Sequence, residues 1–305
     1  MGSISEFGSI ILMQGFNGLS VFSVLLLMAL GLALIFGQMG VINMAHGEFL
    51  TIGAYTTYAI SKLAENYFPS FMPYYFLFAM VAAFVVAYLV GWIVELGLIQ
   101  YLYKRPLDTL LATWGLSLIM QQAFRSIFGA KEVSATLPDW LMGSFQPMEG
   151  VDIPINGVFV MAITLALTVA LFIGLFRSRW GLQVRATVQN RTMASAVGIN
   201  TKLVDRSTFA LGCGIAGIAG AAFTTIGSTG PTAGSLYIVD AFLTVVFGGA
   251  ASLLGTIASA FSIAQTQAIS EFFLTGSTAK VLTLSAVIII LMLRPQGLFA
   301  SKVRR

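Results

Sequence analysis

The sequence is poor in the residues that build catalytic and metal sites. Its 305 residues include one cysteine and one histidine, and only 9% of them are charged. A lone cysteine excludes a disulfide framework and a thiolate metal site, and a lone histidine excludes most metal centres and catalytic triads. No G-x-x-x-x-G-K-[ST] sequence occurs, so the chain does not bind and split ATP through a P-loop. We therefore expect no bound metal, no cofactor and no enzymatic activity.

Charge is too scarce for a water-exposed surface. Soluble domains carry roughly 25% charged residues, whereas this chain is 57% hydrophobic. The apolar runs are continuous, which predicts an all-α, polytopic transmembrane helical bundle, and about eight or nine spans of ~20 residues fit the length. We expect residues 1–305 to form a single transmembrane domain. The predicted spans are 10–36, 47–61, 74–99, 109–128, 155–176, 208–226, 239–254, 256–272 and 281–293.

The positive charges lie where they would set orientation in a membrane. The net charge is +4, and clustered basic residues between spans face the cytoplasm, so the charge does not indicate nucleic-acid binding. Residues 104–105 and 177–206 are therefore predicted to be cytoplasmic, and the acidic stretch 129–153 to lie on the outer face. The C-terminus is predicted to be cytoplasmic because it carries Arg294, Lys302, Arg304 and Arg305.

Residues 177–206 form the only long polar segment and carry six of the sixteen Lys and Arg residues. Asn190 can cap a helix over 191–197, and Gly198 suits a left-handed stop. The apolar side of this helix is formed by Met193, Ala194, Ala196 and Val197. One interpretation is a docking surface for a cytoplasmic partner. The other is a surface helix lying on lipid headgroups.

Residues 38–46 are predicted to be a break inside the membrane, followed by an unusual polar cluster. Asn43, His46 and Glu48 lie within six residues among several glycines. Polar groups at membrane depth pair with one another or face a cavity. The functional interpretation is that Asn43, Glu48 and Thr51 line a solute path. The structural interpretation is that His46 and Glu48 satisfy freed backbone groups and fix the break.

A second set of glycine-rich breaks lies at 227–231 and 248–249. Two interrupted segments in corresponding halves suggest inverted repeats that meet near the midplane. Asp240 follows the first of these breaks and is either a cavity residue or a helix-terminus acid. Residues 212–217 match G-x-G-x-x-G, but the apolar context favours close helix packing over dinucleotide binding.

Several stretches resemble the LivH-like permeases of ABC importers for branched-chain amino acids and related solutes. They are residues 31–37 (GLALIFG), 41–48 (VINMAHGE), 53–55 (GAY), 181–186 (GLQVRA) and 196–200 (AVGIN). A closer resemblance is to the urea permeases of this family (UrtB). It depends on residues 105–115 (RPLDTLLATWG), 121–122 (QQ), 189–191 (QNR), 237–240 (YIVD) and 294–299 (RPQGLF).

The resemblance implies a bacterial inner-membrane machine with several partners. These are a second homologous permease subunit, two cytoplasmic ATPase subunits and a periplasmic solute-binding protein, all within membrane lipid. It places an ATPase-coupling helix within 189–200. The expected coupling residues are Arg185, Gln189, Asn190, Arg191, Met193, Ala194, Val197 and Gly198. The expected substrate-path residues are Asn43, His46, Glu48, Thr51 and Asp240.

These features predict a permease subunit of an ATP-driven importer that works by alternating access, with urea as the leading substrate. Few intramembrane charges are available for a zwitterion, which favours a small neutral solute. The nearer alternative is the same machine carrying a branched-chain amino acid or a short amide. The more distant alternative is a stand-alone urea channel or carrier, which would need no docking helix.

Overall fold

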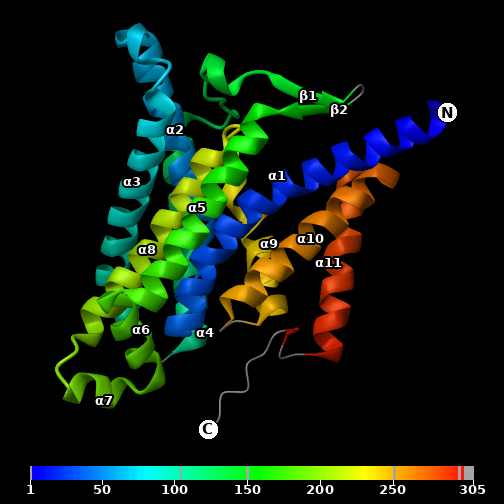
Figure 1. The fold of residues 1–305 in the computed structure, drawn as a ribbon. Coiled ribbons are helices and arrows are strands. Elements are labelled where there is room, and N and C mark those ends of the chain that lie inside the picture. The colour runs from blue at the N-terminus through cyan, green and yellow to red at the C-terminus, as the bar shows by residue number, and fades with distance from the viewer. Residues whose placement is uncertain (1, 104, 149–150, 250–251, 295–296, 299–305) are drawn as a thin grey trace.

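The computed structural model describes residues 2–103, 105–148, 151–249, 252–294 and 297–298, which form a bundle of α-helices (Figure 1). The long helices are α1 (Gly2–Met39), α2 (His46–Tyr67), α3 (Tyr75–Gly97), α4 (Pro106–Phe128), α5 (Ile155–Arg177), α8 (Thr201–Phe223), α9 (Ala233–Gly248), α10 (Leu253–Phe273) and α11 (Gly276–Leu293). Two short helices, α6 (Arg179–Gln189) and α7 (Arg191–Ala196), connect α5 to α8. An antiparallel hairpin of β1 (Ser144–Met148) and β2 (Val151–Pro154) precedes α5.

The predicted all-α membrane bundle is confirmed, and each predicted span corresponds to one long helix. Within the described ranges, five helices are long and apolar enough to cross a membrane: α1, α5, α8, α11 and α3 with its short extension to Tyr101. The apolar helix α9 is shorter, with 16 residues. The chain is therefore a multi-pass membrane protein. Lys104, Lys302, Arg304 and Arg305, on which the orientation prediction partly depends, lie outside the described residues.

Several predicted boundaries were wrong; α2, for example, continues to Tyr67, past the predicted end at 61. The span 239–254 was predicted to run through Gly248, but α9 ends there because Gly249 has a φ of +93°. The span 208–226 in fact begins at Thr201, where Asn200 caps α8 by accepting the Leu203 amide at 3.2 Å. The span 281–293 begins at Gly276, so Lys280 belongs to α11.

Helix α8 is the central helix of the bundle and packs against α1, α2 and α3. Its small residues allow these approaches: a Cβ on Gly212 would lie 2.6 Å from the Gly31 carbonyl oxygen, and one on Gly53 would lie 1.9 Å from that of Gly217. The backbones of α1 and α2 therefore touch that of α8 directly. Residues 212–217 belong to α8 and are buried in the bundle, so the G-x-G-x-x-G match reflects helix packing, as predicted.

The break between α1 and α2 lies inside the bundle. The ring nitrogen Nε2 of His46, the first residue of α2, is 3.3 Å from the carbonyl oxygen of Met28. Met28 precedes the end of α1 by eleven residues, which is about 16 Å of helix. Residues 40–45 therefore turn back beside α1 before α2 begins. A break between helices is therefore present within the predicted range 38–46, with its nonhelical part over residues 40–45, and its depth in the membrane stays a prediction.

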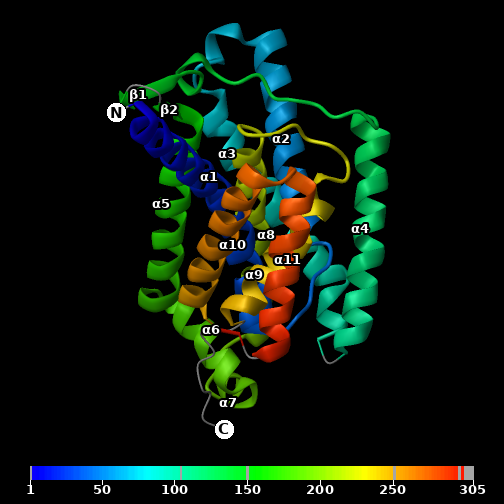
Figure 2. The same cartoon turned by 90° about the vertical axis from the view of Figure 1, so that its right-hand side faces the viewer.

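The two ends of the bundle differ in character. Helices α6 and α7 form one end, while the β1–β2 hairpin and the C-terminal tip of α2 lie at the other (Figures 1 and 2). Helix α4 stands at the side of the bundle and packs mainly on α2 (Figure 2). Its opposite face is apolar and exposed at Leu111, Trp114 and Leu118. A face of this composition suits contact with lipid or with another membrane subunit.

Candidate functional site

Glu48 is held by polar side chains of α4. Its Oε1 accepts hydrogen bonds from Ser117 Oγ and Gln121 Nε2, each at 2.9 Å. Its Oε2 is buried and has no hydrogen-bond partner among the described residues. The carboxyl group therefore joins α2 to α4, which has few other contacts with the bundle, and retains one acceptor atom for a further partner.

Asn43 and His46 stabilise the break through the backbone. Asn43 Oδ1 accepts the Ala45 amide at 3.0 Å, which forms a tight turn before α2. Because His46 Nε2 faces the Met28 carbonyl, this nitrogen must donate, so the neutral ring carries its proton there. Both side chains are fully buried. The contact of His46 matches the structural interpretation, in which His46 and Glu48 satisfy freed backbone groups. Glu48 departs from it, because its partners are side chains of α4, and Asn43, expected on the solute path, contacts the backbone instead.

Thr51 connects the two broken segments of the chain. Its Oγ1 accepts the backbone amide of Gly234, in the first turn of α9, at 2.9 Å. A Cβ on Gly47 would lie 2.2 Å from the Gly234 carbonyl oxygen, so the first turns of α2 and α9 are in direct backbone contact. The breaks of the two halves therefore meet, as expected for inverted repeats. The repeat symmetry itself stays a prediction.

Asp240 lies apart from this cluster and pairs with Lys280, which the sequence reasoning missed. The Lys280 ammonium lies 2.8 Å from Asp240 Oδ2 and donates to the Leu236 carbonyl at 3.2 Å. It also lies 5.9 Å from the centre of the Tyr237 ring, within the range of a cation–π contact. Asp240 is therefore a paired acid about two turns into α9, and not a cap at its terminus.

The Asp240–Lys280 pair lines a polar cavity of about 640 Å³. The cavity lies between α1, α9, α10, α11 and the start of α5, and its polar lining includes Asn17, Asn156 and Glu271. Ligand sites have volumes of roughly 300–1,000 Å³. Of the five predicted substrate-path residues, Asp240 lines this cavity, whereas Asn43, His46, Glu48 and Thr51 are packed in the interior.

The helix predicted over 191–197 is present as α7, and its cytoplasmic side stays a prediction. Asn190 Oδ1 accepts the Met193 amide at 3.0 Å, and Gly198 follows the helix with a φ of +88°. The helix ends at Ala196, one residue before the predicted end. Met193 and Val197 are 64% and 77% exposed, so this end of the molecule presents an apolar tip. The capped helix is short and stands clear of the bundle core (Figure 1).

The other predicted coupling residues fall into two groups. Arg185, Gln189, Asn190 and Gly198 are exposed near this tip. Ala194, in contrast, is buried, and its amide and carbonyl groups bond to Asn190 and Ile199. Ala194 therefore packs α7 onto its own chain, which corrects its expected place on the docking surface.

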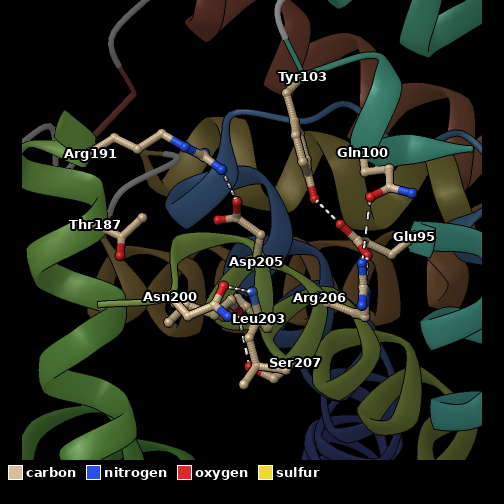
Figure 3. A network of polar contacts seen from close by, with 12 residues as sticks. Glu95, Gln100, Tyr103, Thr187, Arg191, Asn200, Leu203, Asp205, Arg206 and Ser207 are labelled. Atoms are coloured by element: carbon tan, nitrogen blue, oxygen red, sulfur yellow. Dashed lines mark hydrogen bonds and ion pairs between the residues drawn. The ribbon is translucent and has the colours of Figure 1, made fainter. Parts of the chain in front are cut away.

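Arg191, the first residue of α7, begins a polar network that leads into the bundle (Figure 3). Its guanidinium group pairs with Asp205 in α8 and lies 5.5 Å from the centre of the Tyr103 ring. Tyr103 donates to Glu95 Oε1 at 2.6 Å, and Arg206 Nε lies 2.6 Å from Glu95 Oε2. Burial, together with the hydrogen bond to Glu95, raises the pKa of the Tyr103 hydroxyl, so this group stays a donor. The network joins α7, α8 and α3.

Several residues of these sites were missed by sequence reasoning, although one group carried a signal. Thr109, Thr113, Ser117 and Gln121 repeat every four residues along α4, which places them on one helix face. Thr113 Oγ1 accepts the Met44 amide at 3.1 Å, so this polar stripe faces the break. Glu95 and Arg206 gave no comparable signal, because they are 111 residues apart in the sequence.

Residues 15–293 match the family described as the permease component of branched-chain amino acid transport systems. The high-affinity branched-chain amino acid permease protein LivH of Salmonella typhimurium is 28% identical over 94% of each chain. BraD of Pseudomonas aeruginosa is 29% identical over 94% of this chain and 95% of its own. A probable LivH of Methanocaldococcus jannaschii is 25% identical over 90% of this chain and 88% of its own.

No solved structure matches the chain. The family match covers nearly all of the described bundle, from the N-terminal half of α1 to the last residue of α11. The chain therefore belongs to the family of permease components of branched-chain amino acid transport systems.

Proposed function

We propose that this chain is the permease subunit of an ATP-driven importer whose substrates are branched-chain amino acids. The observation that carries the proposal is the arrangement of its two ends. An exposed, capped helix with an apolar tip lies at one end, and a cavity lined by Asp240 and Lys280 lies toward the other. The LivH and BraD relatives are named as branched-chain amino acid permeases, which supports this substrate class over urea.

The proposed coupling route runs from α7 through the polar network into the bundle. ATPase subunits dock on Met193 and Val197, and Arg191 carries the motion of α7 to Asp205 in α8. Because α8 packs directly against α1, α2 and α3, its displacement reaches both broken segments. Alternating access then follows from the movement of α2 and α9 against each other where Gly47 meets Gly234.

The proposal includes the partners that a permease without a P-loop requires. Two cytoplasmic ATPase subunits supply energy, a second homologous permease subunit completes the membrane part, and a periplasmic binding protein delivers solute. Residues 1–305 form one permease domain in the bacterial inner membrane. Exposed apolar side chains on α4 and α11, such as Ile119 and Ile289, offer surface for lipid and for the second permease. A stand-alone channel would leave the exposed tip of α7 without a role.

Urea stays the second candidate substrate, because the stretches 105–115 and 237–240 resemble urea permeases. The earlier argument for a neutral solute was the scarcity of intramembrane charge. Lys280 and Asp240 weaken that argument, since they supply both signs of charge beside one cavity. Branched-chain amino acids are therefore the substrates that the arrangement supports better.

The substrate is tested by competition in proteoliposomes that contain the complete transporter and ATP. We expect labelled leucine to accumulate, and unlabelled isoleucine and valine to reduce its uptake at least tenfold at saturation, while urea has no effect. Accumulation of labelled urea that leucine does not reduce would instead support the second candidate. Uptake by this chain alone, without ATP or partners, would refute the importer proposal.

We propose that Glu48 acts on the solute path mainly by holding α4 against the first turn of α2. Glu48→Gln keeps the side-chain shape and a carbonyl acceptor for Ser117 or Gln121, so we expect uptake within about threefold of wild type. Glu48→Ala leaves both donors without their partner at an apparent cost of about 1–3 kcal/mol, and we expect a lower melting temperature. If Glu48→Gln abolished uptake at unchanged melting temperature, the carboxylate would act on the solute or a proton instead.

A further inference from the structure

The Asp240–Lys280 ion pair retains a hydrogen-bond acceptor on Asp240 and a hydrogen-bond donor on Lys280 for a further partner. Asp240 is only 7% exposed. Its Oδ2 contacts Lys280, but its Oδ1 is buried without a hydrogen-bond partner in the described part of the chain. A buried carboxylate oxygen in this state is unusual, because buried polar atoms are nearly always paired. The vacant acceptor is suited to a charged donor from a bound molecule.

Lys280 offers the complementary group. An ammonium has three N–H donors, of which one is directed to Asp240 Oδ2 and one to the Leu236 carbonyl. The side chain is one-third exposed and lines the same cavity as Asp240. The third donor is therefore available to an anionic group in the cavity, close to the vacant Asp240 oxygen.

We propose that Asp240 and Lys280 recognise the α-ammonium and α-carboxylate of an amino acid entering the permease, an inference that rests on the proposed import of amino acids. The α-ammonium donates to Asp240 Oδ1, and the α-carboxylate accepts the third N–H of Lys280. Glu271 also lines the cavity, where Gln267 donates to it at 2.9 Å. Two acids and one lysine leave an excess of negative charge that favours the ammonium end of the ligand.

The position of the cavity fits a site of entry. Its lining comes from the middle of α1, the start of α5, the end of α8 with the turn after it, the N-terminal half of α9, the end of α10 and the second turn of α11. These segments lie away from α6 and α7, toward the end that bears the β1–β2 hairpin (Figures 1 and 2). A binding protein that docks at that end would release its amino acid beside Asp240 and Lys280.

The test uses the complete transporter in proteoliposomes with saturating leucine-loaded binding protein. The quantity measured is leucine transported per ATP hydrolysed. We expect Asp240→Asn and Lys280→Gln each to lower it about tenfold, the size that corresponds to losing one charge-assisted hydrogen bond. Stimulation of ATP hydrolysis by the binding protein should persist. Glu65→Gln removes the exposed Lys62–Glu65 ion pair of α2, at 2.7 Å, and serves as the matched control with wild-type transport.

A charge-swapped variant distinguishes recognition of the amino acid by this pair from a role in which the pair only holds α9 against α11. Asp240→Lys with Lys280→Asp retains an ion pair but reverses both charges in the cavity, so we expect transport per ATP to stay low while the melting temperature recovers. Recovery of transport in this variant would overturn the inference. If wild type moves leucine and both single variants match it, the inference alone fails. If wild type moves no leucine, the proposed function fails.

Discussion

Replacing Met193 and Val197 together by aspartate is expected to abolish ATP-driven uptake, with a loss of at least about 100-fold. Both side chains are exposed at the apolar tip of α7, and an apolar contact of two such residues contributes roughly 3–6 kcal/mol when fully buried. Two carboxylates at the same positions would have to be desolvated in the ATPase interface, which adds a further penalty. The measurement is uptake of labelled leucine by the complete transporter, together with co-purification of the ATPase subunits.

The control for added negative charge is Leu182→Asp with Val188→Asp on the neighbouring helix α6. These side chains are also exposed, at 61% and 48%, but lie outside the tip of α7. We expect this variant to retain ATPase binding and most of the uptake. In the α7 variant, solute capture by the binding protein should be unchanged, because that step needs no permease. Normal uptake by Met193→Asp with Val197→Asp would refute the docking role of α7.

Removing Arg206 is expected to destabilise the bundle by about 3–5 kcal/mol, the usual effect of breaking a buried ion pair from one side. Glu95 is 1% exposed in its side chain and Arg206 19%, and their charged atoms are 2.6 Å apart. In Arg206→Ala, the Glu95 carboxylate would keep the Tyr103 hydroxyl but lose its countercharge. The guanidinium also lies 5.5 Å from the centre of the Trp92 ring, a contact that would be lost too.

A double variant without either charge distinguishes the cost of the unpaired charge from general loss of packing. Glu95→Gln with Arg206→Met removes both charges and retains the side-chain volumes, so we expect it to recover most of the stability lost in Arg206→Ala. The measurement is the thermal melting of the detergent-purified chain. A change below about 0.5 kcal/mol in Arg206→Ala would mean that the pair holds no buried charge in the membrane.

Features that depend on local sequence were predicted well. Continuous apolar runs indicated the long helices, the cap at Asn190 and the stop at Gly198 located α7, and the polar glycine-rich stretch located the break before α2. These signals are local because helix length, capping and left-handed backbone depend on neighbouring residues. The substrate-path roles of Asn43, Glu48 and Thr51 stay predictions, since their contacts show only how they are held.

Features that depend on distant pairing were missed. Asp205 and Arg206 were assigned to a polar loop, yet both belong to α8 and find partners on α7 and α3. Lys280 lay just outside the last predicted span, 281–293, and a lysine is costly in a membrane helix. Asp240, 40 residues earlier, offsets that cost. A single sequence shows each charge without its partner, so such charges resemble ordinary loop residues.

Photo-crosslinking from position 197 tests most directly whether α7 receives the force that the ATPase subunits generate. A benzophenone amino acid at Val197 in the complete transporter should yield a crosslinked product with an ATPase subunit, and its yield should change between the ATP-bound and nucleotide-free states. Crosslinking to the periplasmic binding protein, or to lipid alone in both nucleotide states, would contradict the account.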